Sequence, residues 1–218
     1  MTLEIDGLRV RPRGGAPLFP PLDLAVAPGE MAVVMGPSGV GKSTLLDAIG
    51  GHLDHGFACE GRVRLNGRDV TRLPPEARRI GLVFQDAALF PHLSVADNLA
   101  FGLSRRLGGR AARRAAVAEA LERAGLPGMG GRDPATLSGG QRARAALMRT
   151  LLAEPEALLL DEPFSSLDTQ RRADMRAFTL DHVRRLSIPA LLVTHDPADA
   201  DAAGGACISL GPGPAAPG

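Results

Sequence analysis

The sequence predicts an α/β fold with a mainly parallel central sheet, an antiparallel β region near the amino terminus and a helical insert. Two short apolar runs, ALLLD (157–161) and PALLVTH (189–195), each end in polar residues, as buried parallel strands do where they reach an edge of a sheet. Longer segments with helical periodicity alternate with such runs, and this alternation is typical of the α/β class. The 218 residues suffice for one domain with a subdomain.

Three strands and one helix are expected near the amino terminus. Strand signals occupy LEIDGLRV (3–10), LDLAVA (22–27) and MAVVM (31–35). The last of them is uniformly apolar, as in a strand buried on both faces. A glycine-rich turn follows it, and the segment KSTLLDAIGGHL (42–53) after the turn predicts a helix.

Further β structure is expected after this helix and at the carboxyl end. The segment GRVRLNGRDV (61–70) predicts a hairpin with Asn66-Gly67 at its turn. RIGLVF (79–84) and ACISL (206–210) predict two more strands. The last residues, 211–218, are all Ala, Gly or Pro, and they predict a disordered tail.

The middle of the chain, from about residue 86 to about residue 150, has a helical pattern. SVADNLAFGL (94–103) predicts a helix with Ser94 as its cap. Two further helices are expected at 112–126 and 139–154. This region is the predicted helical insert.

The composition narrows the class of protein. A formal net charge of +1 provides no long-range field for polyanions, so we expect no nucleic-acid partner. Cys59 and Cys207 are far apart in sequence, which argues against a disulfide framework and indicates a cytosolic protein. The sequence contains no run of 18 apolar residues and no apolar signal core at its start. We expect a chain that does not cross a membrane itself but can bind a protein that does.

Lys42 is the only lysine among 25 basic residues, and it lies in GPSGVGKST (36–44). This stretch matches the pattern G-x-x-x-x-G-K-[ST] between a predicted strand and a predicted helix. Backbone N–H groups of such a loop wrap a polyphosphate, and the compact lysine ammonium fits where a planar guanidinium does not. The loop therefore predicts a nucleoside triphosphate site, with the Ser43 hydroxyl on Mg²⁺. Its residues are Gly36, Pro37, Ser38, Gly39, Val40, Gly41, Lys42, Ser43 and Thr44.

An acidic pair, Asp161 and Glu162, ends the apolar run at 157–161. Asp161 is suited to hold Mg²⁺, and Glu162 to polarise an attacking water. In isolation the pair could equally be a solvated strand end. Because it follows the phosphate loop by about 120 residues, it predicts a hydrolytic site.

The stretch LSGGQ (137–141) opens a predicted helix, and a glycine-rich helix start is a second device for binding phosphate. With LSGGQ and the phosphate loop together, the chain resembles the ATP-binding subunits of ABC transporters over nearly its whole length. The resemblance implies a P-loop NTPase (RecA-like) core, with ATP and Mg²⁺ as ligands, and a head-to-tail homodimer. Each ATP would then lie between the phosphate loop of one copy and four residues of the other, Ser138, Gly139, Gly140 and Gln141.

Other positions of this family match one at a time. Gln85 resembles the Q-loop glutamine near the metal and water, and Asp168 resembles the D-loop residue at the subunit boundary. His195 resembles the switch histidine that contacts the γ-phosphate, although a histidine that ends an apolar strand is by itself more often structural. The implied catalytic set is Lys42, Gln85, Glu162 and His195, and the implied metal ligands are Ser43, Gln85 and Asp161.

The chain departs from the family pattern near its amino terminus. The family places an aromatic ring there to stack on adenine, but this chain has no Trp or Tyr. The equivalent position falls at Arg13, whose plane can stack on a base or can be a solvated charge, while Phe19 is expected in the core. His52, His55 and Cys59 are close enough in sequence for a metal site. A surface loop is favoured, because no fourth ligand follows.

Residues 73–103 resemble the Q-loop and helical insert of bacterial importer ATPases, and the whole run is similar to the short YnjD-like importer ATPases. The resemblance implies a peripheral subunit at the cytoplasmic face of the bacterial inner membrane, serving integral membrane permease subunits and, indirectly, a solute-binding protein. An exporter or lipoprotein-release ATPase shares every catalytic motif and is the alternative. A non-transport ABC ATPase and a plain P-loop kinase are less favoured. The apolar residues expected to touch the permease are Phe84, Leu89, Phe90 and Pro91.

The motifs also suggest how one ABC ATPase domain, 1–218, is organised. The nucleotide-binding core with its β subdomain is expected at 1–85 and 146–210, and the helical subdomain with LSGGQ at 86–145. The tail is expected at 211–218.

Overall fold

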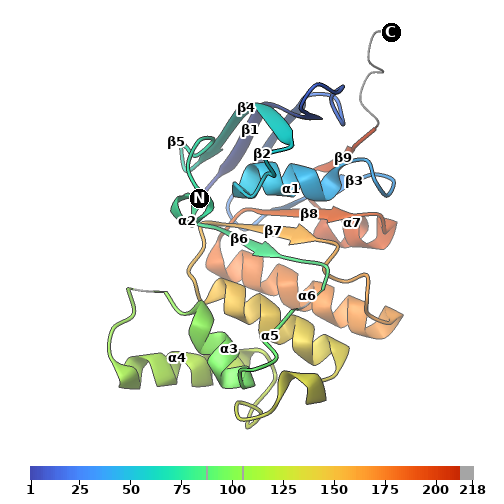
Figure 1. The fold of residues 1–218 in the computed structure, drawn as a ribbon. Coiled ribbons are helices and arrows are strands. Elements are labelled where there is room, and N and C mark those ends of the chain that lie inside the picture. Colours follow the sequence, from blue (N-terminus) through green and yellow to red (C-terminus); the bar gives the residue numbers. More distant parts are fainter. Residues whose placement is uncertain (87, 105, 212–218) are drawn as a thin grey trace. The chain divides into compact units, whose positions relative to one another are not determined.

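The computed structural model describes residues 1–86, 88–104 and 106–211 (Figure 1). Contacts within the chain divide it into two compact units. The core unit comprises Met1–Leu82, Glu156–Glu162 and Leu180–Gly218, and the helical unit comprises Val83–Pro155 and Pro163–Thr179. The subdomain boundaries expected from the motifs stay a prediction, and residues 212–218 of the expected tail lie outside the described residues.

The core unit is built on a five-stranded sheet with the strand order β6-β7-β8-β3-β9. Its strands are β3 (Met31–Met35), β6 (Ile80–Val83), β7 (Ala157–Asp161), β8 (Ala190–Thr194) and β9 (Cys207–Ser209). Strand β8 pairs in parallel with both β3 and β7, and β9 pairs in parallel with β3. The predicted mainly parallel sheet is confirmed, and so is the predicted last strand.

A second sheet in the core unit is antiparallel, with the order β2-β1-β4-β5. Its strands are β1 (Leu3–Pro12), β2 (Leu22–Val26), β4 (Phe57–Leu65) and β5 (Arg68–Asp69). In β2 buried and exposed residues alternate, as expected for a sheet with one face on a core. Asn66 and Gly67 join β4 to β5 with φ angles of 55° and 75°, the left-handed pair that a tight hairpin turn requires. The predicted hairpin is confirmed.

Helix α1 (Lys42–Gly50) packs its apolar face into the core between the two sheets (Figure 1). Leu45, Leu46 and Ile49 are buried in one cluster with side chains of β1, β3 and β7. Two short helices complete the core unit, α2 (Pro75–Arg78) and α7 (Pro197–Ala203). The sequence predicted α1 from its position after the glycine-rich turn, and that prediction is confirmed.

The helical unit contains α3 (Val95–Gly102), α4 (Arg110–Arg123), the 3₁₀ turn η1 (Pro134–Thr136), α5 (Gly139–Leu151) and the first part of α6 (Thr169–Leu186). Ser94 caps α3 as predicted, because its hydroxyl accepts a hydrogen bond from the Asp97 N–H at 3.1 Å. Helix α6 has no counterpart among the predicted elements. No helix in the described part of the chain is long and apolar enough to span a membrane.

A close crossing fixes α3 against α5. A Cβ built on Gly102 would lie 2.0 Å from the carbonyl oxygen of Arg149, so no side chain fits at this position. Beside the crossing, Asn98 is fully buried, and its side-chain amide donates to the carbonyls of Phe90, Leu93 and Ser94. The Asn98 oxygen accepts from the Phe90 N–H at 2.7 Å. One buried amide therefore holds the whole turn that leads into α3.

A buried arginine fixes the carboxyl end of α1. The Arg78 side chain, 5% exposed, donates to four carbonyl oxygens at 2.7 to 2.9 Å, those of Ala48, Ile49, Thr71 and Leu73. Burial lowers the pKa of its guanidinium from the ordinary value. The last carbonyls of a helix have no partner within the helix, so Arg78 satisfies groups that would otherwise be buried without one.

Replacing Arg78 by methionine keeps much of the apolar stem and removes all four donors. We expect Arg78→Met to lower the free energy of unfolding by about 3 kcal/mol, because buried carbonyls lose charge-assisted hydrogen bonds. Chemical denaturation measures the change, and Arg72→Met, at an exposed arginine nearby, is the control. Equal stability of the two variants would contradict a structural role for Arg78.

Candidate active site

The phosphate loop joins β3 to α1, and its glycines adopt backbone conformations that other residues avoid. Gly39 and Gly41 have φ angles of 82° and 100°. Around Gly39 a Cβ would meet nothing within 4 Å, whereas a Cβ on Gly41 would lie 3.0 Å from Leu18. The N–H groups of the first turn of α1 have no acceptor within the helix. The loop therefore combines an open backbone with a helix start, an arrangement that fits a polyphosphate.

Lys42 turns its ammonium back over this loop. Its Nζ donates to the carbonyl oxygens of Gly36 at 2.9 Å and Pro37 at 3.2 Å, and it lies 3.4 Å from Oε1 of Glu162. The side chain is only 6% exposed. A compact ammonium can reach three acceptors that surround it, which a planar guanidinium cannot. This geometry accounts for the single lysine of the sequence.

Glu162 contacts both Lys42 and His195. Its Oε2 lies 2.9 Å from Nδ1 of His195, while Oε1 faces Lys42. The residue has a φ of 43°, in the left-handed region, and its N–H donates to the Val193 carbonyl at 3.0 Å. Such a backbone costs about 1 kcal/mol for a residue with a side chain. This strained position directly follows β7 and holds the carboxylate between the two basic groups.

Asp161 and Ser43 offer the oxygen ligands that Mg²⁺ prefers. Burial raises the pKa of the Asp161 carboxyl, while a hydrogen bond from the Ser43 side chain opposes that rise. The neighbouring Glu162 also raises this pKa, and Lys42 lowers it. A divalent cation would relieve the crowding of negative charge, so the donor set fits the metal.

The sequence offered a second candidate for a metal site, at His52, His55 and Cys59. Across the part of the chain that the structure describes, no group of three or more His, Cys, Asp or Glu side chains could hold a metal. This includes His52, His55 and Cys59: the two histidines lie in the turn before β4, and Cys59 lies in β4 itself.

Two buried residues that the sequence analysis missed, Thr194 and Asp199, fix the backbone around His195. The Thr194 hydroxyl donates to Oδ2 of Asp199 at 2.8 Å, and it accepts from the Asp196 N–H at 3.1 Å. Both Thr194 and Asp199 are buried. These contacts fix the backbone on either side of His195, whose ring is exposed. The signal in the sequence was the run of acidic residues that follows His195.

The LSGGQ stretch begins α5 in the helical unit. The Ser138 hydroxyl accepts from the Gln141 N–H at 3.3 Å, and the Gln141 side chain accepts from the Ser138 N–H at 2.9 Å. This reciprocal capping box leaves the N–H groups of Gly139 and Gly140 in the first turn without a helical acceptor. The same four residues thus start the helix and present two donors.

The structure brings one group of predicted site residues together in the core unit: Lys42, Ser43, Asp161, Glu162 and His195. Gln85, Asp168 and the LSGGQ residues belong to the helical unit. Gln85 is exposed, and Asp168 caps α6 by accepting from the Arg171 N–H at 3.0 Å. Their predicted roles toward nucleotide stay predictions.

Arg13 lies at the end of β1, exposed. Its Nε donates to the His55 carbonyl at 2.8 Å, and its backbone N–H donates to the Gly56 carbonyl at 2.8 Å. Phe19 is fully buried, which confirms that it belongs to the core and leaves Arg13 as the candidate for the base.

Comparison with known proteins agrees with this site. Residues 19–165 match the ABC transporter family. The chain is 51% identical over 181 residues to the uncharacterized ABC transporter ATP-binding protein YnjD of Escherichia coli. The match covers 83% of each of the two chains. It is 48% identical over 178 residues to the thiamine import ATP-binding protein ThiQ of Cereibacter sphaeroides, covering 82% of this chain and 76% of that one.

A sulfate/thiosulfate import ATP-binding protein, CysA of Mycobacterium bovis, is 48% identical over 179 residues, covering 82% of this chain and 50% of the relative. The match thus spans half of that longer protein. These relatives and the family match lead to one conclusion. The chain belongs to the ABC transporter family as an ATP-binding protein, an ATPase coupled to transport.

Proposed function

We propose that two copies of this chain associate head to tail, hydrolyse ATP between them and drive the import of a solute through membrane permease subunits. The observation that carries the proposal is the Glu162 carboxylate, held between Lys42 and His195 beside the phosphate loop. A carboxylate in this position can accept a proton from water that attacks a terminal phosphate.

The core unit binds the triphosphate through the loop and the start of α1. First-turn N–H groups donate to phosphate oxygens, and Lys42 exchanges the carbonyls of Gly36 and Pro37 for a phosphate oxygen. Ser43 and Asp161 would hold Mg²⁺, Gln85 of the helical unit is proposed as a further ligand, and the bound ion would neutralise charge on the phosphates. Arg13, exposed directly after β1, would stack its plane on the base.

Hydrolysis needs one proton transfer from this chain's side chains. As water forms a bond to the γ-phosphorus, the bond to the bridging oxygen of ADP breaks, and Glu162 accepts the proton of the water. His195 keeps the carboxylate oriented through Nδ1 and lies where it can contact the γ-phosphate. The products are ADP and phosphate.

A second copy completes each site. The N–H groups of Gly139 and Gly140, with Ser138 and Gln141, would contact the phosphates bound by the partner's loop, and Asp168 would lie at the boundary. The capping box supports this assignment, because it orders the first turn of α5 without consuming these two donors.

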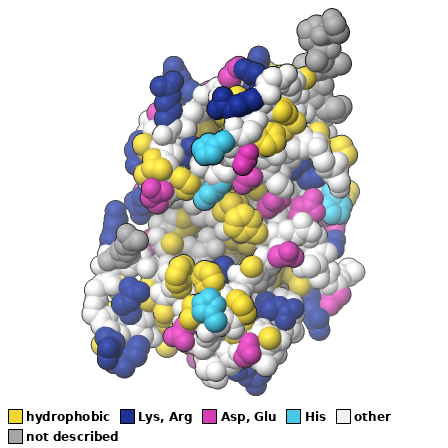
Figure 2. Space-filling model, viewed as in Figure 1, with side chains coloured by type: hydrophobic (Ala, Val, Ile, Leu, Met, Phe, Trp, Pro, Cys, Tyr) yellow, Lys and Arg dark blue, Asp and Glu magenta, His cyan; other side chains and the backbone are white. Residues whose placement is uncertain are grey.

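Exposed aromatic side chains in the helical unit support docking of a permease. Phe84 and Phe101 are 58% and 69% exposed, and hydrophobic side chains are visible on this part of the surface (Figure 2). Phe101 meets Phe90 edge to face at 4.7 Å, and Arg149 lies over the Phe90 ring. We propose that Phe84, Phe90 and Phe101, with Leu89 and Pro91, serve together as the docking surface for the permease, and we call this set the aromatic patch. The sequence analysis missed Phe101.

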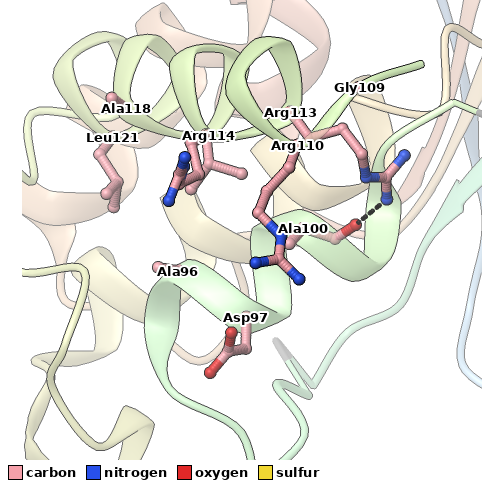
Figure 3. A pocket seen from close by; sticks show the side chains of 10 residues that line it. Ala96, Asp97, Ala100, Gly109, Arg110, Arg113, Arg114, Ala118 and Leu121 are labelled. Carbon is pink, nitrogen blue, oxygen red and sulfur yellow. Dashed lines mark hydrogen bonds between the residues drawn. The ribbon is translucent and has the colours of Figure 1, made fainter. Parts of the chain in front are cut away.

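A groove lies between α4 and α3, the helix that carries Phe101. It encloses about 630 Å³, and Figure 3 shows arginines of α4 and small residues of α3 along it. Arg113 donates to the carbonyls of Ala100 and Leu107. The walls are mainly apolar and the edge is cationic, which favours a permease segment that carries apolar side chains and carboxylates.

Import is favoured over export by the relatives, of which two are named for thiamine import and for sulfate/thiosulfate import. We place the dimer at the cytoplasmic face of a bacterial inner membrane, peripheral to its permease, with a solute-binding protein as an indirect partner. Membrane association would then depend on the aromatic patch and the groove.

The first test concerns the proposed base. We expect Glu162→Gln to bind ATP and form a dimer while hydrolysis falls by about 100-fold or more, because the amide cannot accept the proton. Phosphate release and size-exclusion chromatography with ATP measure the two properties. Glu76→Gln, at an exposed acid of α2, is the control. Normal turnover in Glu162→Gln would remove Glu162 as the base.

The second test concerns the base of the nucleotide. We expect Arg13→Tyr to raise the preference for ATP over GTP several-fold, since a neutral ring stacks on adenine without attracting the acceptor edge of guanine. The ratio of kcat/KM values for the two nucleotides measures it. Arg9→Tyr, at an exposed position of β1, should leave the ratio unchanged. An identical ratio in wild type and Arg13→Tyr would argue that Arg13 does not meet the base.

The third test concerns the aromatic patch. We expect Phe101→Asp to abolish co-purification with the co-expressed permease, because a charge in an apolar contact is not compensated. Leu186→Asp is the matched control, at another exposed apolar residue, 40% exposed. If the Phe101→Asp variant still co-purified with the permease, the docking surface would have to lie elsewhere on the chain.

A further inference from the structure

A small cavity adjoins the LSGGQ helix start in the helical unit. It encloses about 160 Å³ and is lined from α5 by Ser138, Gly140 and Arg144, and from α6 by Arg171 and Asp174. The cavity therefore lies between Gly140, one of the two proposed phosphate donors of α5, and two arginines. The proposed dimer gives a role to the α5 donors and none to Arg171.

Arg171 lies beside Gly140. A Cβ built on Gly140 would be 3.8 Å from Cδ of Arg171, so the guanidinium beyond that carbon is within reach of a group bound at Gly140. Arg144 is less available, because its guanidinium lies over the Phe178 ring at 5.3 Å. Asp174 accepts a hydrogen bond from the Gln170 side chain at 3.2 Å. Because the Arg144 guanidinium is stacked on that ring, Arg171 is the candidate of the two arginines.

The ion pair that Arg171 makes is a weak one. Its Nη1 lies 3.2 Å from Oδ2 of Asp168, and both side chains are more than half exposed, at 57% and 56%. Exposed pairs of this kind contribute little to stability. A phosphate offers more charge and a bidentate geometry for guanidinium. Exchange of Asp168 for phosphate would also leave the α6 cap intact, since that cap uses Oδ1 and the Arg171 backbone N–H.

From these contacts we infer that Arg171 is a phosphate-binding residue that acts on the nucleotide held by the second copy. The inference rests on the proposed head-to-tail dimer. Arg171 leaves Asp168 when the dimer closes, and its guanidinium joins the N–H groups of Gly139 and Gly140 on the γ-phosphate. The chain thereby adds a full positive charge to a helix start that otherwise offers only partial charges.

The test uses the full-length chain carrying Glu162→Gln, the variant that we expect to retain ATP in the dimer. We expect Arg171→Gln in this background to raise the ATP concentration for half-maximal dimerisation about tenfold, the effect of one lost charge-assisted hydrogen bond. Arg171→Lys should recover part of the loss. Sedimentation velocity with MgATP measures dimerisation, and fluorescent ATP measures affinity in the monomer at low protein concentration.

Arg132→Gln is the matched control, because Arg132 is an exposed arginine of the same unit. Unchanged dimerisation of Arg171→Gln would overturn the inference, while the dimer of the parent would still support the proposed function. An equal loss of affinity in the monomer would also overturn it, since a residue acting on the partner's nucleotide cannot affect the monomer. If the parent itself fails to dimerise with ATP, the proposed function and the inference both fall.

Discussion

The parallel register of β7, β8 and β3 is the constraint on which the site depends. Met35 pairs with Thr194, and Asp161 pairs with Val193, so the three strands end at the same edge of the sheet. The phosphate loop, His195 and Glu162 each follow one of these ends. A shift of one residue in either pairing would reverse the faces of a strand and separate the carboxylate from both basic groups. The apolar packing of the sheet thus sets distances among charged atoms.

Much of this arrangement follows from the sequence alone. Uniform apolar runs predict buried parallel strands, so the polar residues that end them, Asp161 and His195 among them, were expected at one edge of the sheet. Lys42 was found by the glycine-rich motif around it, and the role of His195 came from the resemblance to the family. The left-handed backbone of Glu162 could not be predicted, because it results from a hydrogen bond to Val193 on a strand distant in sequence. Arg78 was missed for a similar reason: its four acceptors come from two segments, 48–49 and 71–73, whose proximity exists only in the folded chain.

In the helical unit the sequence revealed the motifs but did not predict part of the structure. Helix α6 carries many charged residues, as in TQRRADMRAF, and has no clear apolar stripe by which periodicity could identify it. LSGGQ was recognised as a phosphate motif, yet the structure adds that Ser138 and Gln141 satisfy each other. The Ser138 hydroxyl accepts in this capping box and keeps its own O–H as a donor. Together with the N–H groups of the two glycines, it forms the contact surface proposed for phosphate.

The charges around Glu162 suggest how binding and hydrolysis are ordered. Lys42 faces both Oε1 of Glu162 and the loop carbonyls, so its ammonium stands beside the proposed base. A phosphate oxygen competes for the same ammonium, and its greater charge draws Lys42 toward the loop. Lys42 then no longer faces Oε1 of Glu162, while Oε2 keeps its contact with His195. In the proposed mechanism the substrate itself thus displaces the ammonium that faces the base, so that proton acceptance follows nucleotide binding and does not precede it.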